Sequence, residues 1–481
     1  MEPQGAVAAP EDGMALGFAT DAAGARPIWL ATREEWPDVR GRLPAAARDF
    51  AAAAGYEPAA GKLLLLPGPD GLAGAVFGLG AREAAARDPF LPGQLATTLP
   101  AGVWRFDGAP AAPDQAALAF LLSSYRFTRY KGAPGEVARL VCPAGADARH
   151  LESLANAVAF GRDLINTPAN DMGPEELAEA ARDLARAHDA PFSAIVGDAL
   201  LDARLPLIHA VGKASAQAPR LVEFTWGETA APKVTLVGKG VCFDTGGLDI
   251  KPDTAMLLMK KDMGGAATAL ACARMIMEAG LSVRLRVILP IVENAVSGAA
   301  FRPGDVYPSR KGLSVEIGNT DAEGRLILAD ALALADEDAP DLLFDFATLT
   351  GAARVALGPD LPPFWCTDDA LAAEIAAAGA RENDPVWRLP LWEPYDKLLD
   401  GKISDLNNVS SGPFAGAITA ALFLRRFVSK ARAWTHFDIY GWSPSAKPGR
   451  PEGGDIQTAR LVFSLIEQRL RDGGLAEART S

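Results

Sequence analysis

The chain has 481 residues, of which 49% are hydrophobic and 22% are charged. This profile excludes a disordered protein, and the length exceeds what one ordinary hydrophobic core accommodates, so we expect two or three domains. The formal net charge of −13 opposes general binding to nucleic acids or anionic membranes, because both require a basic surface.

Cysteine usage and the apolar segments predict a cytoplasmic protein that does not contact a membrane. Residues 1–13 carry acids where a signal peptide carries basic residues. The most apolar helical stretch, residues 264–280, is interrupted by Arg274 and is shorter than a membrane span. The four widely separated cysteines form no CxxC pair, which favours a reducing compartment; they are Cys142, Cys242, Cys272 and Cys366.

The first part of the chain, residues 1–145, is predicted to form a small α/β domain. Short apolar runs at residues 26–32, 62–68 and 73–80 are typical of strands. The Ala-rich pattern at residues 44–55 is typical of a helix.

A helix and a loop are predicted to connect this domain to the rest of the chain. The helical pattern at residues 147–166 leads into "TPANDMGP", residues 167–174, whose Pro, Asn and Gly residues break regular structure. We therefore place a linker at residues 146–170 and a second, larger domain at residues 171–481.

The larger domain is predicted to be an α/β domain with a mostly parallel sheet flanked by helices on both faces. Its near-continuous apolar strands alternate with helical segments, which is the pattern of such sheets. The predicted strands are residues 206–212, 220–226, 233–241, 284–292, 341–349 and 434–441. Ligands bind these sheets at the carboxyl ends of the strands, so polar residues at those ends are candidates for a site.

Charged residues stand beside glycines at the edges of three apolar elements. "TLVGKGVCFDTGG" carries Lys239 and Asp244, and "MLLMKKDMGG" carries Asp262 just before a long helix. Glycine lets the backbone bend tightly and approach a ligand closely. These acids are therefore candidates for a binding site.

The third such place is "NTDAEGRL", residues 319–326. In an extended loop, side chains at alternate positions point the same way, so Asp321, Glu323 and Arg325 would face one site. Gly324 would let the loop bring both charges to one cavity.

Three segments of clustered acids predict bound metal, because unpaired acids are costly in a low dielectric unless a cation neutralises them. The alternative is that they are helix caps and surface ion pairs, which explains neither Lys239 nor the acid–acid–Arg array. No histidine has a metal-binding spacing, and His209 and His436 lie in apolar strand patterns typical of core residues. A site rich in oxygen suits divalent Mn, Mg, Co or Zn.

Two adjacent divalent ions favour hydrolysis, since they activate water and polarise a carbonyl or a phosphoryl group. Spacing alone does not distinguish an amide from a phosphate ester. Lys239, if buried among metal ions, would lose its proton and coordinate, whereas Lys251 would stay charged and stabilise an oxyanion. The alternative for both lysines is a solvated strand end.

These segments resemble the leucyl aminopeptidases, the cytosol aminopeptidase family of dinuclear metallopeptidases. "NTDAEGRL" matches the family signature without a change. "VGKGVCFDTGGLDIKP", "MKKDMGGAAT", "DFATLTGA" and "AGAITAALFL" follow the family's order and spacing. The resemblance covers roughly residues 160–481 and is weak over the first 145. It implies peptide substrates and a homohexamer, whereas the net charge already argues against nucleic acid and membrane as partners.

The resemblance also implies two divalent metal ions per subunit, Mn²⁺ or Zn²⁺, with Mg²⁺ or Co²⁺ as further options. Asp244 and Glu323 would bridge the two ions. Lys239 and Asp262 would complete one coordination sphere, and Asp321 would complete the other. A water held between the ions would attack the scissile carbonyl.

The remaining roles are likewise carried over from the family. Arg325 would hold a bicarbonate ion as general base, assisted by the backbone near Leu349, and Lys251 would polarise the carbonyl. The pocket for the N-terminal side chain would be apolar and tolerant, favouring hydrophobic, Leu-like residues; it maps onto Met259, Thr348 and Gly351. A two-metal phosphoesterase and a non-catalytic hexameric scaffold or DNA-binding relative remain as alternatives.

Three features depart from the family pattern. Thr245 stands where many relatives have serine, and Lys261 adds a charge directly before Asp262, where it would tune metal affinity. The loop at residues 443–455 carries three prolines, and it would either border the site entrance or form a plain surface loop.

Overall fold

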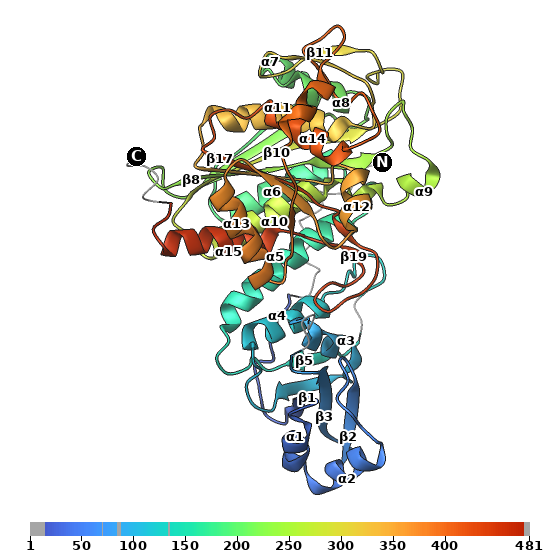
Figure 1. The fold of residues 1–481 in the computed structure, drawn as a ribbon, viewed down its shortest axis with the longest axis vertical. Helices are drawn as coiled ribbons and strands as arrows, with labels where there is room; N and C mark the ends of the chain where they lie inside the picture. Colours follow the sequence, from blue (N-terminus) through green and yellow to red (C-terminus); the bar gives the residue numbers. More distant parts are fainter. Residues whose placement is uncertain (1–14, 70, 84–87, 133–134, 476–481) are drawn as a thin grey trace, which may run out of the picture. The chain divides into compact units, whose positions relative to one another are not determined.

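The computed structural model describes residues 15–475 except 70, 84–87 and 133–134. The expectation for residues 1–13 therefore lies outside the described residues. The chain divides into two compact units (Figure 1). Among the described residues, the larger unit contains Phe160–Pro444 and residues 453–475, whereas the smaller unit contains residues 15–159 together with Ser445–Glu452.

The smaller unit is an α/β fold built on a five-stranded sheet with the order β2-β3-β1-β4-β5. β1 is parallel to β3 and β4, β4 is parallel to β5, and β2 is antiparallel to β3. The predicted strands and helix in this part are confirmed within about two residues. The strands are β1 (Arg26–Thr32), β2 (Leu63–Gly68), β3 (Gly71–Gly80), β4 (Gly102–Phe106) and β5 (Ala138–Leu140). The helices are α1 (Trp36–Arg42), α2 (Ala45–Ala53), α3 (Leu95–Thr98) and α4 (Pro113–Ser124).

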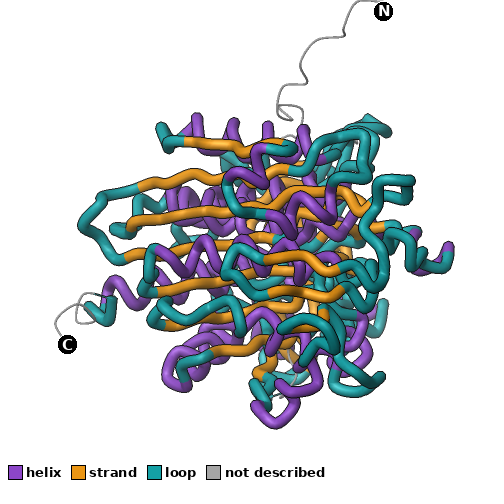
Figure 2. Tube along the Cα trace, turned by 90° about the horizontal axis from the view of Figure 1, so that it is seen from above, coloured by secondary structure: helices purple, strands orange, loops and turns teal. Residues whose placement is uncertain are grey.

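The larger unit is built on a nine-stranded sheet with the order β15-β14-β17-β13-β8-β10-β7-β6, and β9 pairs with β10. Its central strands β17, β13, β8 and β10 are parallel, whereas β7, β6 and β14 join antiparallel. Figure 2 shows these strands side by side. The strands are β6 (Phe192–Val196), β7 (Arg220–Trp226), β8 (Lys233–Gly238), β9 (Gly240–Asp244), β10 (Arg284–Asn294), β13 (Leu342–Ala347), β14 (Pro363–Cys366), β15 (Trp387–Arg388) and β17 (Ala433–Asp438).

Helices cover both faces of this sheet, as predicted (Figure 1). α8, α11 and α14 pack together on one face, whereas α6, α10, α13 and α15 lie on the other. Every residue of β13 and β17 is buried, which explains their continuous apolar sequences. The residues of α5 (Ala148–Asn166) are divided between the two units at residue 160. The other helices of this unit are α6 (Pro174–Ala187), α7 (Ala199–Asp202), α8 (Pro206–Gly212), α9 (Asp253–Met256), α10 (Gly264–Glu278), α11 (Glu323–Glu337), α12 (Gly351–Leu357), α13 (Asp369–Arg381), α14 (Gly416–Arg425) and α15 (Ala459–Arg471).

Short elements complete the larger unit. A three-stranded sheet has the order β11-β12-β16, and β18 pairs with β19. These strands are β11 (Val306–Pro308), β12 (Ser314–Glu316), β16 (Leu406–Asn407), β18 (Trp442–Ser443) and β19 (Gly453–Gly454). Two 3₁₀ helices are η2 (Met259–Met263) and η3 (Glu393–Leu399).

The strand predicted at residues 206–212 is wrong, because this segment is helix α8. A short apolar run fits a buried helix as well as a strand, and Pro206 occupies the first turn, where proline favours a helix start. The amide of Leu207 donates to Asp330 Oδ2 over 2.8 Å, which satisfies one free N–H of that turn.

The two histidines expected in the core differ in outcome. His209 is half-buried on α8, with Nε2 3.0 Å from Asp198 Oδ1, so its placement in a core strand is wrong. His436 is fully buried in β17, which confirms a core residue, and its Nδ1 lies 2.5 Å from Asp345 Oδ1. Its Nε2 has no hydrogen-bond partner among the described residues, so the ring is satisfied on one side only.

All four cysteines are free thiols. Within the described part of the chain, the helices are too short or too polar to cross a membrane.

Candidate metal centre

A cavity of about 650 Å³ opens at the carboxyl ends of β8, β9 and β13. This is the edge at which α/β sheets bind ligands. Every residue predicted for the site lines this cavity: Lys239, Asp244, Lys251, Met259, Asp262, Asp321, Glu323, Arg325, Thr348, Leu349 and Gly351. The structure therefore brings together side chains that are spread over more than a hundred residues of sequence.

Lys239 is positioned by a break in the strand that was predicted at residues 233–241. The run predicted at residues 233–241 is split into β8 and β9, and Lys239 lies between them. Its amide donates to the carbonyl of Phe346 over 3.0 Å, and its carbonyl accepts from the amide of Ala266 over 2.8 Å. Lys239 is thereby held between β13 and the start of α10.

Tight packing of α10 against the sheet brings Asp262 close to Lys239. A Cβ atom on Gly265 would lie 2.1 Å from the carbonyl oxygen of Phe346, so only glycine allows this approach. Asp262 is in η2, directly before α10. Because α10 packs so closely against β13, Asp262 lies at the cavity wall.

Three buried carboxylates form the centre of the cavity. Oxygens of Asp244, Asp262 and Glu323 lie within 4.8 Å of one another. The ammonium of Lys239 lies 2.8 Å from Asp262 Oδ2 and 3.0 Å from Glu323 Oε1, and it donates to the carbonyl of Thr348 over 2.8 Å. Among the described residues, Glu323 Oε2 is buried without a hydrogen-bond partner. Asp262 and Glu323 thus share one ammonium, and one oxygen of Glu323 is left without a partner.

Burial and mutual repulsion shift the pKa values at this centre. Burial and the neighbouring Asp244 raise the pKa of Glu323 to about 8. Burial opposes charge on Lys239, but the carboxylates of Asp262, Glu323 and Asp244 raise its pKa well above the usual range. In this arrangement the Lys239 side chain is therefore an ammonium, and it would be neutral only where metal cations offset those carboxylates.

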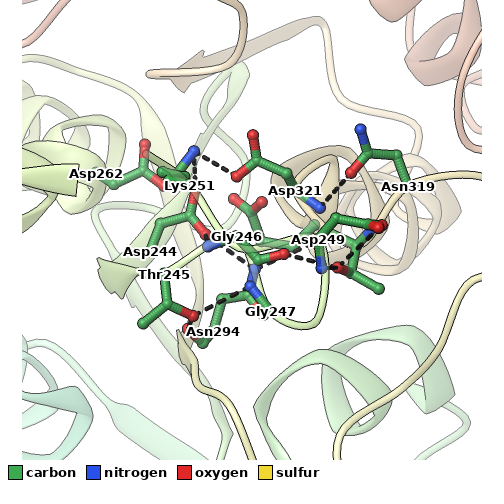
Figure 3. Close-up of polar contacts among 12 residues, drawn as sticks. Asp244, Thr245, Gly246, Gly247, Asp249, Lys251, Asp262, Asn294, Asn319 and Asp321 are labelled. Atoms are coloured by element: carbon green, nitrogen blue, oxygen red, sulfur yellow. Dashed lines mark hydrogen bonds and ion pairs between the residues drawn. The ribbon is translucent and has the colours of Figure 1, made fainter. Parts of the chain in front are cut away.

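A second group of charges lies beside the first (Figure 3). Lys251 Nζ is 2.8 Å from Asp244 Oδ2 and also pairs with Asp321 Oδ1. Asp244 Oδ1 accepts from Asn294 Nδ2 over 2.8 Å and from the amide of Gly246 over 2.9 Å. These bonds fix the Asp244 carboxylate with one oxygen toward the cavity.

The extended loop predicted for residues 319–326 is wrong in part, because Glu323 begins α11 and Arg325 lies in its first turn. Both side chains still line the cavity, although a helix and not alternation along a strand directs them there. Gly324 provides space for a neighbouring side chain and is not needed for a bend in the loop. A Cβ atom there would lie 2.4 Å from Lys239 Cε, so glycine leaves room for that side chain.

Arg325 is a buried cation with unused hydrogen-bonding capacity. Its Nη1 donates to the carbonyl of Asn408 over 2.7 Å, whereas its Nε has no partner among the described residues. Burial lowers the pKa of Arg325 to about 10, so the guanidinium stays charged near neutral pH. It could therefore hold an anion in the cavity.

Three polar residues that support the site were missed in the sequence. Asp438, at the end of β17, accepts from the amide of Leu349 over 2.9 Å and from Thr350 Oγ1 over 2.6 Å, which fixes the backbone after β13. An acid at the end of an apolar strand was a usable signal. Asn294 was missed because the predicted strand stopped at residue 292, and Asn408 follows no pattern that marks it.

The Pro-rich loop at residues 443–455, all of which the structure describes, contributes no residue to the cavity wall. Ser445–Glu452 belongs to the smaller unit. The amide of Gly449 donates to Ser123 Oγ over 2.7 Å, and a Cβ atom on Gly449 would lie 2.4 Å from the ring of Phe90.

Comparison with known families and structures identifies the relatives of this chain. The catalytic-domain model of the cytosol aminopeptidase family matches residues 159–466, and the N-terminal-domain model of the M17 aminopeptidases matches residues 27–143. Residues 27–143 thus match a domain of the family, although their sequence motifs alone resemble the family only weakly.

Individual relatives match at comparable levels. A probable cytosol aminopeptidase of Chlamydia felis is 45% identical over 308 residues, which are 63% of this chain and 61% of the relative. The chain thus spans about three fifths of the length of such curated relatives.

Solved structures match over nearly the whole chain. The crystal structure of a cytosol aminopeptidase from Coxiella burnetii is 44% identical, with a TM-score of 0.87, covering 93% of this chain and 97% of that one. The bottromycin maturation enzyme BotP in complex with Mn is 31% identical, with a TM-score of 0.81, covering 92% and 98%. The fold, the cavity and these matches together lead to one conclusion: the chain belongs to the cytosol aminopeptidase family.

Proposed function

We propose that this protein is a metal-dependent aminopeptidase that releases N-terminal hydrophobic, Leu-like residues from peptides. The observation that carries the proposal is the cavity itself, where three buried carboxylates meet two lysines and an arginine. Membership of the cytosol aminopeptidase family supports the choice of a peptide bond over a phosphate ester.

The residues at this centre fit a pair of divalent cations. Buried carboxylates in contact repel one another unless cations neutralise them, and the unpartnered Oε2 of Glu323 is a free ligand atom. Lys239, Asp244, Asp262, Asp321 and Glu323 would hold the ions. When bound, the ions would supply water activation and polarisation of the carbonyl.

The chain's own cations would orient the reacting groups. Lys251, half-buried and charged, would donate to the oxygen of the scissile carbonyl as negative charge develops there. Arg325 would hold a bicarbonate ion as general base through its unpartnered Nε, near the backbone of Leu349. Met259, Thr348 and Gly351 would receive the first side chain of the substrate.

Several broader assignments belong to the same proposal. Mn²⁺ or Zn²⁺ would be the working ion, with Mg²⁺ or Co²⁺ as alternatives, and the BotP relative solved with Mn supports manganese. The protein would act in the cytoplasm as a homohexamer, and exposed apolar side chains of Leu257, Val355 and Phe414 support assembly. Nucleic acid is not an expected partner, given the net charge of −13.

Stripping and restoring metal tests the proposal. Chelated protein should release no leucine from leucine amide, and Mn²⁺ or Zn²⁺ added alone should restore release. Bound ions should also raise the melting temperature, since a ligand at 100 times its Kd stabilises the folded chain by about 2.7 kcal/mol. Release of phosphate from a generic ester without release of leucine would show a phosphoesterase instead. Inactivity on both, with a gel shift on DNA at physiological salt, would show a binding protein.

Removing the anion site should weaken catalysis without abolishing it. We expect Arg325→Ala to lower kcat on leucine amide, and added bicarbonate to restore part of the loss, because the anion could then enter without its guanidinium partner. The measurement is kcat against bicarbonate concentration for wild type and variant, with Arg432→Ala, an exposed arginine, as the control. If kcat responds to bicarbonate in neither the wild type nor the variant, the proposed role of Arg325 is wrong.

A further inference from the structure

The cavity contains a buried lysine that the proposed metal chemistry does not use. Lys261 is 6% exposed and lines the cavity from η2. Its Nζ lies 4.7 Å from the centre of the Tyr440 ring. In the described part of the chain, no ion pair or hydrogen bond to this ammonium is present. A buried charge without an opposite charge is costly, so this position favours an anion from outside the chain.

A second cation faces the same aromatic ring. Arg354 lies on α12, one turn after Gly351, and its Cζ is 5.4 Å from the centre of the Tyr440 ring. Arg354 also lines the cavity, and no ion pair to it is present among the described residues. A cation–π contact is attractive but leaves the positive charge in place. Lys261, Arg354 and Tyr440 therefore form a cationic cluster on the cavity wall.

The nearest acids do not neutralise this cluster, because other donors occupy them. Asp262 accepts from Lys239 Nζ through Oδ2 and from Thr348 Oγ1 through Oδ1. Asp438 accepts from the amide of Leu349 and from the hydroxyl of Thr350. The ammonium of Lys261 is thus left without a carboxylate to pair with among the described residues.

The cluster lies where the proposed function places the first side chain of the substrate. Met259 and Lys261 are both in η2, and Gly351 and Arg354 are both on α12. A Cβ atom placed on Gly441 would lie 3.0 Å from Thr348 Cγ2 and 3.6 Å from the carbonyl oxygen of Lys261, so Gly441 lies beside both residues. Met259 is thus two residues from Lys261, Gly351 is three residues from Arg354, and all of them line the same cavity as Thr348. The resemblance implies an apolar pocket, but the wall of this cavity also carries two cations.

We infer that the cluster of Lys261, Arg354 and Tyr440 binds the side-chain carboxylate of an N-terminal glutamate or aspartate, so that the protein also releases acidic N-terminal residues. This inference rests on the proposed aminopeptidase function and adds a substrate class to it. The carboxylate would accept from the ammonium and the guanidinium, while the ring of Tyr440 packs against the methylene groups of the side chain. Such charge-assisted hydrogen bonds are about twice as strong as neutral ones.

The test compares substrates that differ only in charge. We would measure kcat/KM on glutamic acid α-amide, glutamine amide and leucine amide for wild type, Lys261→Met, Arg354→Met and the double variant. The ratio of glutamyl to glutaminyl kcat/KM should fall roughly 10- to 100-fold in each single variant, mostly through KM, since a hydrogen bond to a charged group contributes about 1.5–3 kcal/mol. Lys402→Met, an exposed lysine outside the cavity, should leave the ratio unchanged.

Each other outcome has a distinct meaning. An unchanged glutamyl-to-glutaminyl ratio in Arg354→Met and Lys261→Met would overturn the inference and leave the proposed function standing. A loss seen only with dipeptides that carry a free C-terminal carboxylate, whatever their first residue, would assign the cluster to the other end of the substrate and also overturn it. Wild type that releases no leucine with any added metal would instead refute the proposed function. Arg354 is exposed on α12, so its variant tests the inference even if Lys261→Met unfolds.

Discussion

Replacing Glu323 with glutamine should lower kcat/KM on leucine amide by at least about 100-fold while the chain stays folded. The substitution keeps the shape of the side chain and removes the charge that would bridge two cations. It also removes the buried oxygen that lacks a partner among the described residues. Metal bound per chain should fall from two ions to at most one, measured by elemental analysis after dialysis.

The stability of the metal-free chain separates this effect from unfolding. Burial and Asp244 raise the pKa of Glu323 to about 8, above the value of an exposed glutamate. A carboxyl group with a raised pKa in the folded state destabilises the fold as pH rises above its unfolded pKa, so its removal should not lower the melting temperature at pH 7. Glu337→Gln, at the exposed other end of α11, is the matched control and should keep full activity. Wild-type turnover in the metal-saturated Glu323 variant would refute the metal assignment.

Lys251→Met should lower kcat by roughly 100- to 1000-fold with a smaller change in KM, because the lost ammonium would act on charge that develops in the transition state. Lys251 is held between Asp244 and Asp321, and so it points toward the carboxylates proposed to hold the metal ions. Single-turnover measurements on leucine amide would separate the chemical step from binding.

Metal content distinguishes this loss from loss of the cofactor. The ammonium of Lys251 competes with a cation for the oxygens of Asp244 and Asp321, so Lys251→Met should bind Mn²⁺ at least as tightly as wild type. Lys430→Met, an exposed lysine on the surface, should change neither kcat nor metal binding. A variant that loses activity only because it loses metal would disprove the proposed role of Lys251.

The fold was predictable where the pattern of apolar residues had one interpretation. The strands at residues 220–226 and 284–292 contain β-branched or aromatic residues in runs that end at polar positions, and both are confirmed. The strand prediction for residues 206–212 was wrong because a short, mostly apolar run suits a buried helix equally well, and only packing against α11 decides between the two. Residues 233–241 appeared to be one strand because the break at Lys239 depends on bonds to Phe346 and Ala266, far away in sequence.

The site was predictable as a set of residues but not as a geometry. Every residue predicted for the site lines the cavity. Lys239, Glu323 and Arg325 each stand next to a glycine in the sequence, which is the local signal that marked them. The place of Glu323 at a helix start was missed, since an acidic loop and an acidic first helical turn have the same composition. Lys261 was interpreted only as a modifier of metal affinity. Its relation to Tyr440 and Arg354 joins three separate segments, and no local pattern encodes it.

The way the chain returns to its first unit has a consequence for attempts to shorten the protein. Ser445–Glu452 leaves β18, joins the smaller unit and comes back at β19. A chain cut just before Phe160 would lose Ser123 and Phe90, the groups against which Gly449 is seated. The loop between β18 and β19, which contains prolines, would then lack its anchor and would be exposed to solvent and proteases. Excision of the leading domain therefore calls for a second edit, a short turn that joins Ser443 to Gly453 directly.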